Sequence, residues 1–274
     1  MEDRMLQTPA PFDQPFAEAF PQPQPIDPDR PRWGPGAGIG AWAVSIVAPL
    51  VLGVLALIPV MMMEQRALGR MPTQEEMMKS PKVALASIIA TIVGQVIAML
   101  ACWMIVTNMR KQPFFESLGW HWGGLSIARR IGLVVSIVLV MVGLQIGLPH
   151  VLPDSENTQF EQMLRTSATV RILIAAMAVL SAPIVEEIVY RGVLYSGLRS
   201  RIGVPVSVIV VTLLFTAVHV PQYWGAWASL VALTMLSLML TVLRARSKSI
   251  LLCIAVHFVF NCVGAVSILI NKWD

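Results

Sequence analysis

Repeated apolar stretches of about 20 residues dominate this 274-residue sequence and leave few folds open to it. A stretch of that length crosses the hydrocarbon core of a bilayer as a helix. Only helices and closed barrels satisfy their backbone hydrogen bonds in hydrocarbon, and the sequence lacks the alternating pattern of a membrane barrel. We therefore predict a bundle of about seven transmembrane helices (six to eight), at residues 40–63, 83–107, 131–149, 170–198, 204–220, 226–243 and 250–270.

The composition agrees with this interpretation. Hydrophobic residues make up 56% of the chain, charged residues only 13%, and the mean hydropathy is +0.69. Soluble globular domains carry about 25% charged residues. The composition therefore excludes an ordinary soluble domain, and we expect an all-α polytopic membrane domain over residues 39–274.

The segment before the first span is rich in proline, which stands at positions 9, 11, 15, 21, 23, 25, 28, 31 and 35. Few of its residues suit an apolar core, so we expect residues 1–38 to form a disordered, Pro-rich tail. The tail has no basic segment followed by a short apolar one, which argues against a cleavable secretory signal. The first span is then expected to direct insertion.

The charges in the connections predict how the chain lies across the membrane. Basic residues near span ends favour the cytoplasmic side. The connection at 64–82 argues against the resulting topology, because it carries four basic residues on the predicted outer side. We expect a multi-pass protein of a bacterial inner membrane with a cytoplasmic amino terminus. The basic residues that support this are Arg110, Lys111, Arg129, Arg130, Arg199, Arg201, Arg244, Arg246 and Lys248.

Two adjacent carboxylates, Glu186 and Glu187, lie inside the apolar stretch 170–198. An ionisable residue at the centre of a bilayer costs roughly 2.5 kcal/mol or more, so such a pair indicates a functional site. Glu187 and Arg191 are four residues apart and share one helical face, where the arginine can hold the carboxylate ionised. Glu186 points about 100° away around the helix. The two carboxylates can thus divide acid and base roles.

Two later spans contribute further polar residues, namely His219 near the end of 204–220 and His257 with Asn261 in 250–270. At about 1.5 Å per residue, Glu186 lies ~18 Å, His219 ~21 Å and Asn261 ~16 Å from the basic ends of their spans. His257 lies about 6 Å nearer that end. The four residues are therefore expected at a similar depth, where they can form one site.

The predicted site suits hydrolysis of a peptide bond, in one of two ways. Glu186, His219 and His257 can bind a divalent metal, Zn²⁺ above all, with an open position for water and Glu187 as general base. Without metal, Glu186 and His219 can activate the water while His257 and Asn261 stabilise the oxyanion. The sequence leaves both possibilities open.

Three short motifs carry a resemblance to a known family. They are Glu186-Glu187-x-x-x-Arg191, Phe215-x-x-x-His219 and His257-x-x-x-Asn261, in this order on successive predicted helices. With these motifs the chain resembles the CAAX protease and bacteriocin-processing family (CPBP, also called Abi) of intramembrane proteases. The resemblance covers the carboxy-terminal half, with a catalytic core at about 168–271, and no matching motif occurs in the first three spans.

The resemblance implies an intramembrane endopeptidase in which the glutamates and histidines activate water. The implied substrate is a membrane-embedded or lipidated peptide or protein, of the CAAX type or a bacteriocin or leader peptide. The bilayer is the other expected partner; no nucleic acid is expected, and the oligomeric state is left open.

Two other functions remain open from the residues alone. A proton-coupled transporter also uses buried carboxylates and histidines, but it would show polar residues along a path and often internal repeats. A non-catalytic scaffold or immunity protein of the same fold would lose the motif residues. The Glu187–Arg191 pair and the two histidines also have a plain structural interpretation, as contacts that join helices.

Overall fold

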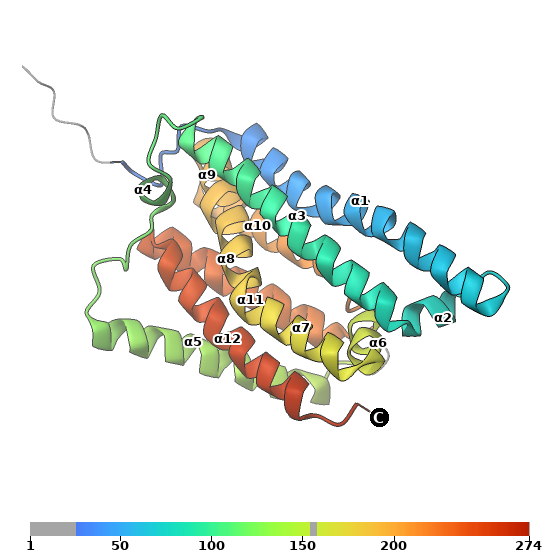
Figure 1. Ribbon diagram of the computed structural model, residues 1–274. Helices are drawn as coiled ribbons and strands as arrows, with labels where there is room; N and C mark the ends of the chain where they lie inside the picture. The colour runs from blue at the N-terminus through green and yellow to red at the C-terminus, as the bar shows by residue number, and fades with distance from the viewer. Residues whose placement is uncertain (1–25, 154–157, 274) are drawn as a thin grey trace, which may run out of the picture.

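The computed structural model of the chain describes residues 26–153 and 158–273, and these residues form helices without any strand (Figure 1). This confirms the predicted all-α fold. The long elements are α1 (Pro35–Leu68), α3 (Pro81–Thr107), α5 (Ile127–Gly147), α7 (Ala168–Leu180), α10 (Val204–His219), α11 (Trp227–Ser247) and α12 (Ile250–Ile270). The shorter ones are α2 (Gln74–Lys79), α4 (Phe114–Leu118), a 3-10 turn (Leu148–His150), α6 (Gln159–Thr166), α8 (Ala182–Glu187), a π-helical segment (Ile188–Leu194) and α9 (Tyr195–Ile202).

Six of the predicted spans correspond to helices that, within the described ranges, are long and apolar enough to cross a membrane. One of them, Ala168–Ile202, is continuous through α7, α8, the π-helical segment and α9. The seventh prediction, 204–220, corresponds to the shorter apolar helix α10. The chain is an integral membrane protein, and its outward-facing leucine, isoleucine and valine side chains suit contact with lipid.

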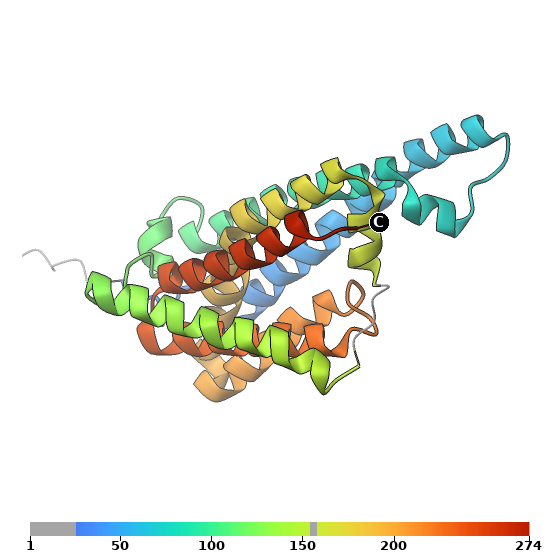
Figure 2. The same cartoon turned by 90° about the horizontal axis from the view of Figure 1, so that it is seen from below.

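The helices pack mainly as antiparallel neighbours. Helix α1 runs along α3, α10 packs on α11, and α12 lies between α7 and α5 (Figure 1). The view from below shows α5 along the outer side of α12 (Figure 2). The two glutamates lie in the continuous helix Ala168–Ile202, which contacts α1, α3, α10 and α12. The site is thus surrounded by protein on several sides.

Most of the basic residues named above lie in or near the connections α3–α5, α9–α10 and α11–α12. These three basic connections and the start of α1 lie at one end of the bundle, while the α1–α3 connection lies at the other (Figure 1). Three of the four basic residues in that connection form ion pairs. Arg70 pairs with Glu76 at 2.5 Å and Lys79 with Glu75 at 2.6 Å; Lys82 lies 3.0 Å from Glu64 of α1. The basic residues that argued against the predicted topology are therefore largely matched by acids.

The boundary of the amino-terminal tail differs from the predicted one. Residues 1–25 lie outside the described residues, so the predicted disorder there stays a prediction. Residues 26–38 are described, and α1 begins at Pro35. Asp29 and Trp33 are buried at 6% and 7% exposure. Their side chains bind charged and polar groups of distant helices, which proline content alone does not reveal.

Small side chains set the close packing of α1 on α3. The buried face of α3 carries Ala90, Gly94, Ala98 and Cys102, a spacing of four that brings small residues onto one stripe. A Cβ atom on Gly94 would stand 2.8 Å from the ring and backbone nitrogen of Pro49 in α1. Neither group can move aside easily, so the glycine is required by the approach of the two helices.

We expect Gly94→Ala to lower the free energy of unfolding by about 1 to 2 kcal/mol, because overpacking of a rigid contact exceeds the gain in helix propensity. Gly53→Ala in α1 is the matched control, since a Cβ there has nothing within 4 Å. Unfolding of both variants by SDS in mixed micelles, followed by circular dichroism, measures the difference. Equal stability of the two variants would contradict this packing.

Candidate active site

Glu187, at the end of α8, is the buried centre of the candidate site. Its side chain is 0% exposed, and its Oε1 accepts a hydrogen bond of 2.9 Å from Nη1 of Arg191. The same oxygen lies 2.8 Å from Nδ1 of His257 in α12. Oε2 has no hydrogen-bonding partner among the described residues. The predicted i, i+4 ion pair is thus present, and it also holds a histidine.

Arg191 is fully buried and uses the rest of its guanidinium to bind α11. Nε donates to Oγ1 of Thr241 at 3.2 Å, and Nη2 donates to the carbonyl and hydroxyl oxygens of Ser237 at 3.1 and 2.9 Å. The guanidinium carbon lies 4.8 Å from the centre of the Phe215 ring. Sequence reasoning missed Ser237 and Thr241. Their four-residue spacing places them on one face of α11, which was the available signal.

The helix that carries the two glutamates changes its winding directly after them. Residues Ile188–Leu194 form a π-helical segment, and all seven are buried. Single π turns are rare within α-helices and occur frequently at functional sites. Gly192 lies in this segment, where a Cβ atom would stand 2.9 Å from Leu118 and 3.1 Å from Ile250. The segment therefore packs closely against α4 and α12 while Arg191 still reaches Glu187.

Glu186 differs from its neighbour because part of its side chain is exposed at the surface of the protein. Its side chain is 26% exposed, and its Oε2 lies 3.9 Å from Nε2 of His257, beyond hydrogen-bonding distance. No residue of the described ranges forms a hydrogen bond with its carboxylate. The imidazole of His257 thus stands between the two glutamates, with Nδ1 on Glu187 and Nε2 toward Glu186.

His219 joins the site through Phe215. Its Nδ1 lies 2.8 Å from the Phe215 carbonyl oxygen in the same helix, so Nδ1 carries the proton and Nε2 is left to other partners. The Phe215 ring centre is 4.7 Å from the ring of His219 and 6.4 Å from that of His257. Tyr190 packs on the same ring at 5.1 Å. The Phe215 ring therefore lies near both histidines.

Asn261, one turn after His257, binds a different element. Its Nδ2 donates to the carbonyl oxygen of Ala178 in α7 at 2.8 Å. In this arrangement the amide joins α12 to α7, and it makes no hydrogen bond with either glutamate. The structure thus brings Glu186, Glu187, Arg191 and His257 together, places His219 beside them through Phe215, and leaves Asn261 at the edge.

The predicted zinc ligands Glu186, His219 and His257 do not form a ligand set as they stand. The described ranges contain no group of three histidine, cysteine, aspartate or glutamate side chains close enough to hold a metal ion. Nδ1 of each histidine is occupied, by Glu187 in one case and by the Phe215 carbonyl in the other. We derive no reaction step through a metal, and the zinc site stays a prediction.

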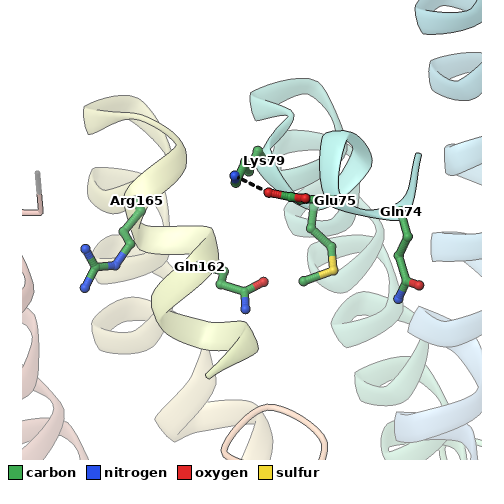
Figure 3. A pocket seen from close by; sticks show the side chains of 6 residues that line it. Gln74, Glu75, Lys79, Gln162 and Arg165 are labelled. Atoms are coloured by element: carbon green, nitrogen blue, oxygen red, sulfur yellow. Dashed lines mark hydrogen bonds and ion pairs between the residues drawn. The ribbon is translucent and has the colours of Figure 1, made fainter. Parts of the chain in front are cut away.

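A separate pocket of about 560 Å³ lies between α2 and α6 (Figure 3). It contains none of the motif residues. Most of the residues that line it have polar side chains, and the Lys79–Glu75 ion pair forms part of one side. The residues that line it are Gln74, Glu75, Met78, Lys79, Gln162 and Arg165.

The fold and the site define a multi-pass membrane protein with a buried carboxylate–arginine–histidine centre. Residues 166–263 match the family model of the type II CAAX prenyl endopeptidases, Rce1-like, and this segment contains all three motifs. The match confirms the family resemblance and identifies the segment as Rce1-like. At the family level it supports an intramembrane CAAX-type endopeptidase. No curated protein and no solved structure matched the chain.

We expect Arg191→Met to lower the free energy of unfolding by about 3 to 5 kcal/mol, because it leaves the buried Glu187 carboxylate without its cation. The double variant Glu187→Gln/Arg191→Met should recover part of this loss, since both charges are then gone. Arg201→Met, at an exposed arginine of α9, is the control. SDS titration of the purified proteins measures all three. Equal stability of Arg191→Met and Arg201→Met would contradict a structural role for the pair.

Proposed function

We propose that this protein is an intramembrane endopeptidase that cleaves a peptide bond in a membrane-associated peptide or protein. The observation that carries the proposal is the arrangement around His257. One carboxylate, Glu187, is buried and held by Arg191, while the other, Glu186, is partly exposed on the far side of the imidazole. The Rce1-like match supports the same reaction class.

In the proposed reaction Glu186 is the general base. Its carboxylate takes a proton from a water molecule as the water oxygen attacks the carbonyl carbon of the peptide bond. The electron pair of the carbonyl moves to its oxygen. When the tetrahedral intermediate collapses, the bond between carbon and nitrogen breaks, and Glu186 returns the proton to the leaving amine. The products are a carboxylic acid and an amine.

The other residues hold the water and the developing charge. The Nε2 lone pair of neutral His219 accepts a hydrogen bond from the attacking water. Glu187 stabilises the protonated imidazole of His257, whose Nε2–H then donates to the oxyanion, as a buried aspartate supports the histidine of a serine protease. Asn261 takes the oxyanion role predicted for it only if its amide leaves the Ala178 carbonyl. Arg191 acts through Glu187 and does not contact the substrate.

The proposed substrates follow from the family and from the membrane. A CAAX-type carboxy-terminal peptide agrees with a family of CAAX prenyl endopeptidases. Bacteriocin or leader peptides are the other candidates. The protein is proposed to lie in a bacterial inner membrane with its amino terminus in the cytoplasm, because its three basic connections gather at the end of the bundle where α1 begins (Figure 1).

We expect Glu186→Gln to lower kcat by a factor of about 100 to 10,000, because the amide cannot accept the proton of the attacking water. Its stability should stay near that of the parent, since the Glu186 side chain is 26% exposed. Cleavage of a farnesylated CAAX peptide and of unmodified membrane peptides can be followed by mass spectrometry. Glu116→Gln, at an exposed acid of α4, is the control. Full cleavage by Glu186→Gln would overturn the assignment.

Zinc content tests the proposed metal directly. If Glu186, His219 and His257 bind zinc, the purified parent should contain about one metal ion per chain, as a structural or catalytic zinc site does. His219→Ala should then contain markedly less. Elemental analysis after dialysis against a weak chelator measures both. Equal metal content in the parent and in His219→Ala would remove His219 from any metal site.

A further inference from the structure

The residues before α1 form a strap across the basic end of the bundle. This amino-terminal strap, residues 26–34, carries Asp29, whose side chain is 3% exposed. The Asp29 carboxylate forms an ion pair with Arg199 of α9 through Oδ2. Its Oδ1 lies 3.4 Å from Nη1 of Arg244 in α11, and its Oδ2 lies 3.3 Å from Nζ of Lys248. One carboxylate thus binds cations from two helices.

The Asp29 carboxylate is the counter-charge for Arg199 and Arg244. The Arg244 side chain is 0% exposed, and its Nη2 donates to the hydroxyl oxygen of Ser196 in α9 at 3.3 Å. Its Nε has no hydrogen-bonding partner among residues 26–153 and 158–273. Without Asp29, the fully buried positive charge of Arg244 on α11 would lie near that of the partly exposed Arg199 on α9 without the carboxylate that binds both. The carboxylate turns this repulsion into attraction.

A second contact joins the strap to the helix that carries Glu186 and Glu187. Nε1 of Trp33 donates to the carbonyl oxygen of Val193 at 2.9 Å, and Val193 lies within the π-helical segment that follows Glu187. Next to it, Gly197 of α9 has no room for a Cβ atom, which would stand 2.9 Å from the Gly34 carbonyl oxygen. The strap therefore lies directly on the helix that carries the two glutamates.

The helices joined by Asp29 are also the two that Arg191 joins. Arg191 extends from the glutamate-bearing helix to Ser237 and Thr241 of α11. Thr241 and Arg244 are three residues apart, or about 4.5 Å along α11. Two sets of polar contacts thus connect the same pair of helices about one turn apart. In the first set Arg191 binds Glu187, which in turn contacts His257. In the second set Asp29 binds Arg199 and Arg244.

We propose that Asp29 is a positioning residue of the active site. By neutralising Arg199 and Arg244, it keeps α9 and α11 at the spacing in which Arg191 holds Glu187, and Glu187 in turn orients His257. Asp29 does not contact the reacting atoms. The kinetic part of this inference rests on the proposed protease function, and its structural part does not.

Kinetics of Asp29→Asn test the catalytic consequence. Its kcat should fall by about tenfold or more with little change in KM, because a shift of about 1 Å in catalytic groups can cost about 100-fold. Asp29→Glu, which keeps the charge, should restore much of the loss. Asp27→Asn is the matched control, because Asp27 is 37% exposed and forms an ion pair with Lys248. The Asp27 carboxylate also accepts a hydrogen bond of 3.1 Å from the Asp29 backbone N–H, and the amide oxygen of asparagine can still accept it. A kcat of Asp29→Asn equal to that of Asp27→Asn would overturn the proposal.

A distance measurement tests the positioning itself, independently of any activity. Spin labels at positions 201 in α9 and 246 in α11, both exposed, report the separation of the two helices in a Cys262→Ser background. Asp29→Asn should lengthen or broaden this distance, while Asp27→Asn and Asp29→Glu should not. An unchanged distance in Asp29→Asn would overturn the proposal. If the parent cleaves no peptide probe, the protease function fails, while the distances still decide the role of Asp29.

Discussion

The rest of this structure depends on one buried negative charge, the carboxylate of Glu187. A lone carboxylate removed from water is too costly to persist, so it must be paired and hydrogen-bonded. Arg191 supplies the cation from the next helical turn, but a buried guanidinium has five N–H donors that also need partners. Ser237 and Thr241 of α11 provide partners for it, and His257 of α12 lies at the same Oε1 of Glu187 that Arg191 binds. Satisfying a single charge therefore decides which three helices meet.

The exposed fraction of the side chains rises in steps across this centre. The side chain of Glu187 is 0% exposed, that of His257 is 4% exposed and that of Glu186 is 26% exposed. Glu187 is thus enclosed between a guanidinium and an imidazole, whereas part of the Glu186 side chain is exposed. The surroundings of the adjacent glutamates differ because the helix turns by about 100° between them.

The sequence predicts what depends on local spacing and misses what depends on distant contacts. The Glu187–Arg191 pair follows from the i, i+4 geometry of a helix, and the spans follow from the length of apolar stretches. The binding of Arg191 to α11 depends on how two helices cross, which one sequence does not reveal. For the same reason Asn261 lies on Ala178 instead of the glutamates, and Asp29, 215 residues from Arg244, was assigned to a disordered tail.

Arg191 and Arg244 are both buried, and each is paired with a carboxylate, but the two carboxylates come from different parts of the chain. Arg191 has a carboxylate four residues before it, and hydroxyl groups on the neighbouring helix complete its shell. Arg244 has a hydroxyl from Ser196 but no carboxylate within the segment 166–263 that matches the Rce1-like family; Asp29 supplies it from outside. Near the end of the bundle a carboxylate can come from a segment outside the spans, whereas the centre of the bilayer admits only groups carried on helices. The family segment is therefore not electrostatically complete by itself, and the described residues before α1 belong to the same packed unit in this physical sense.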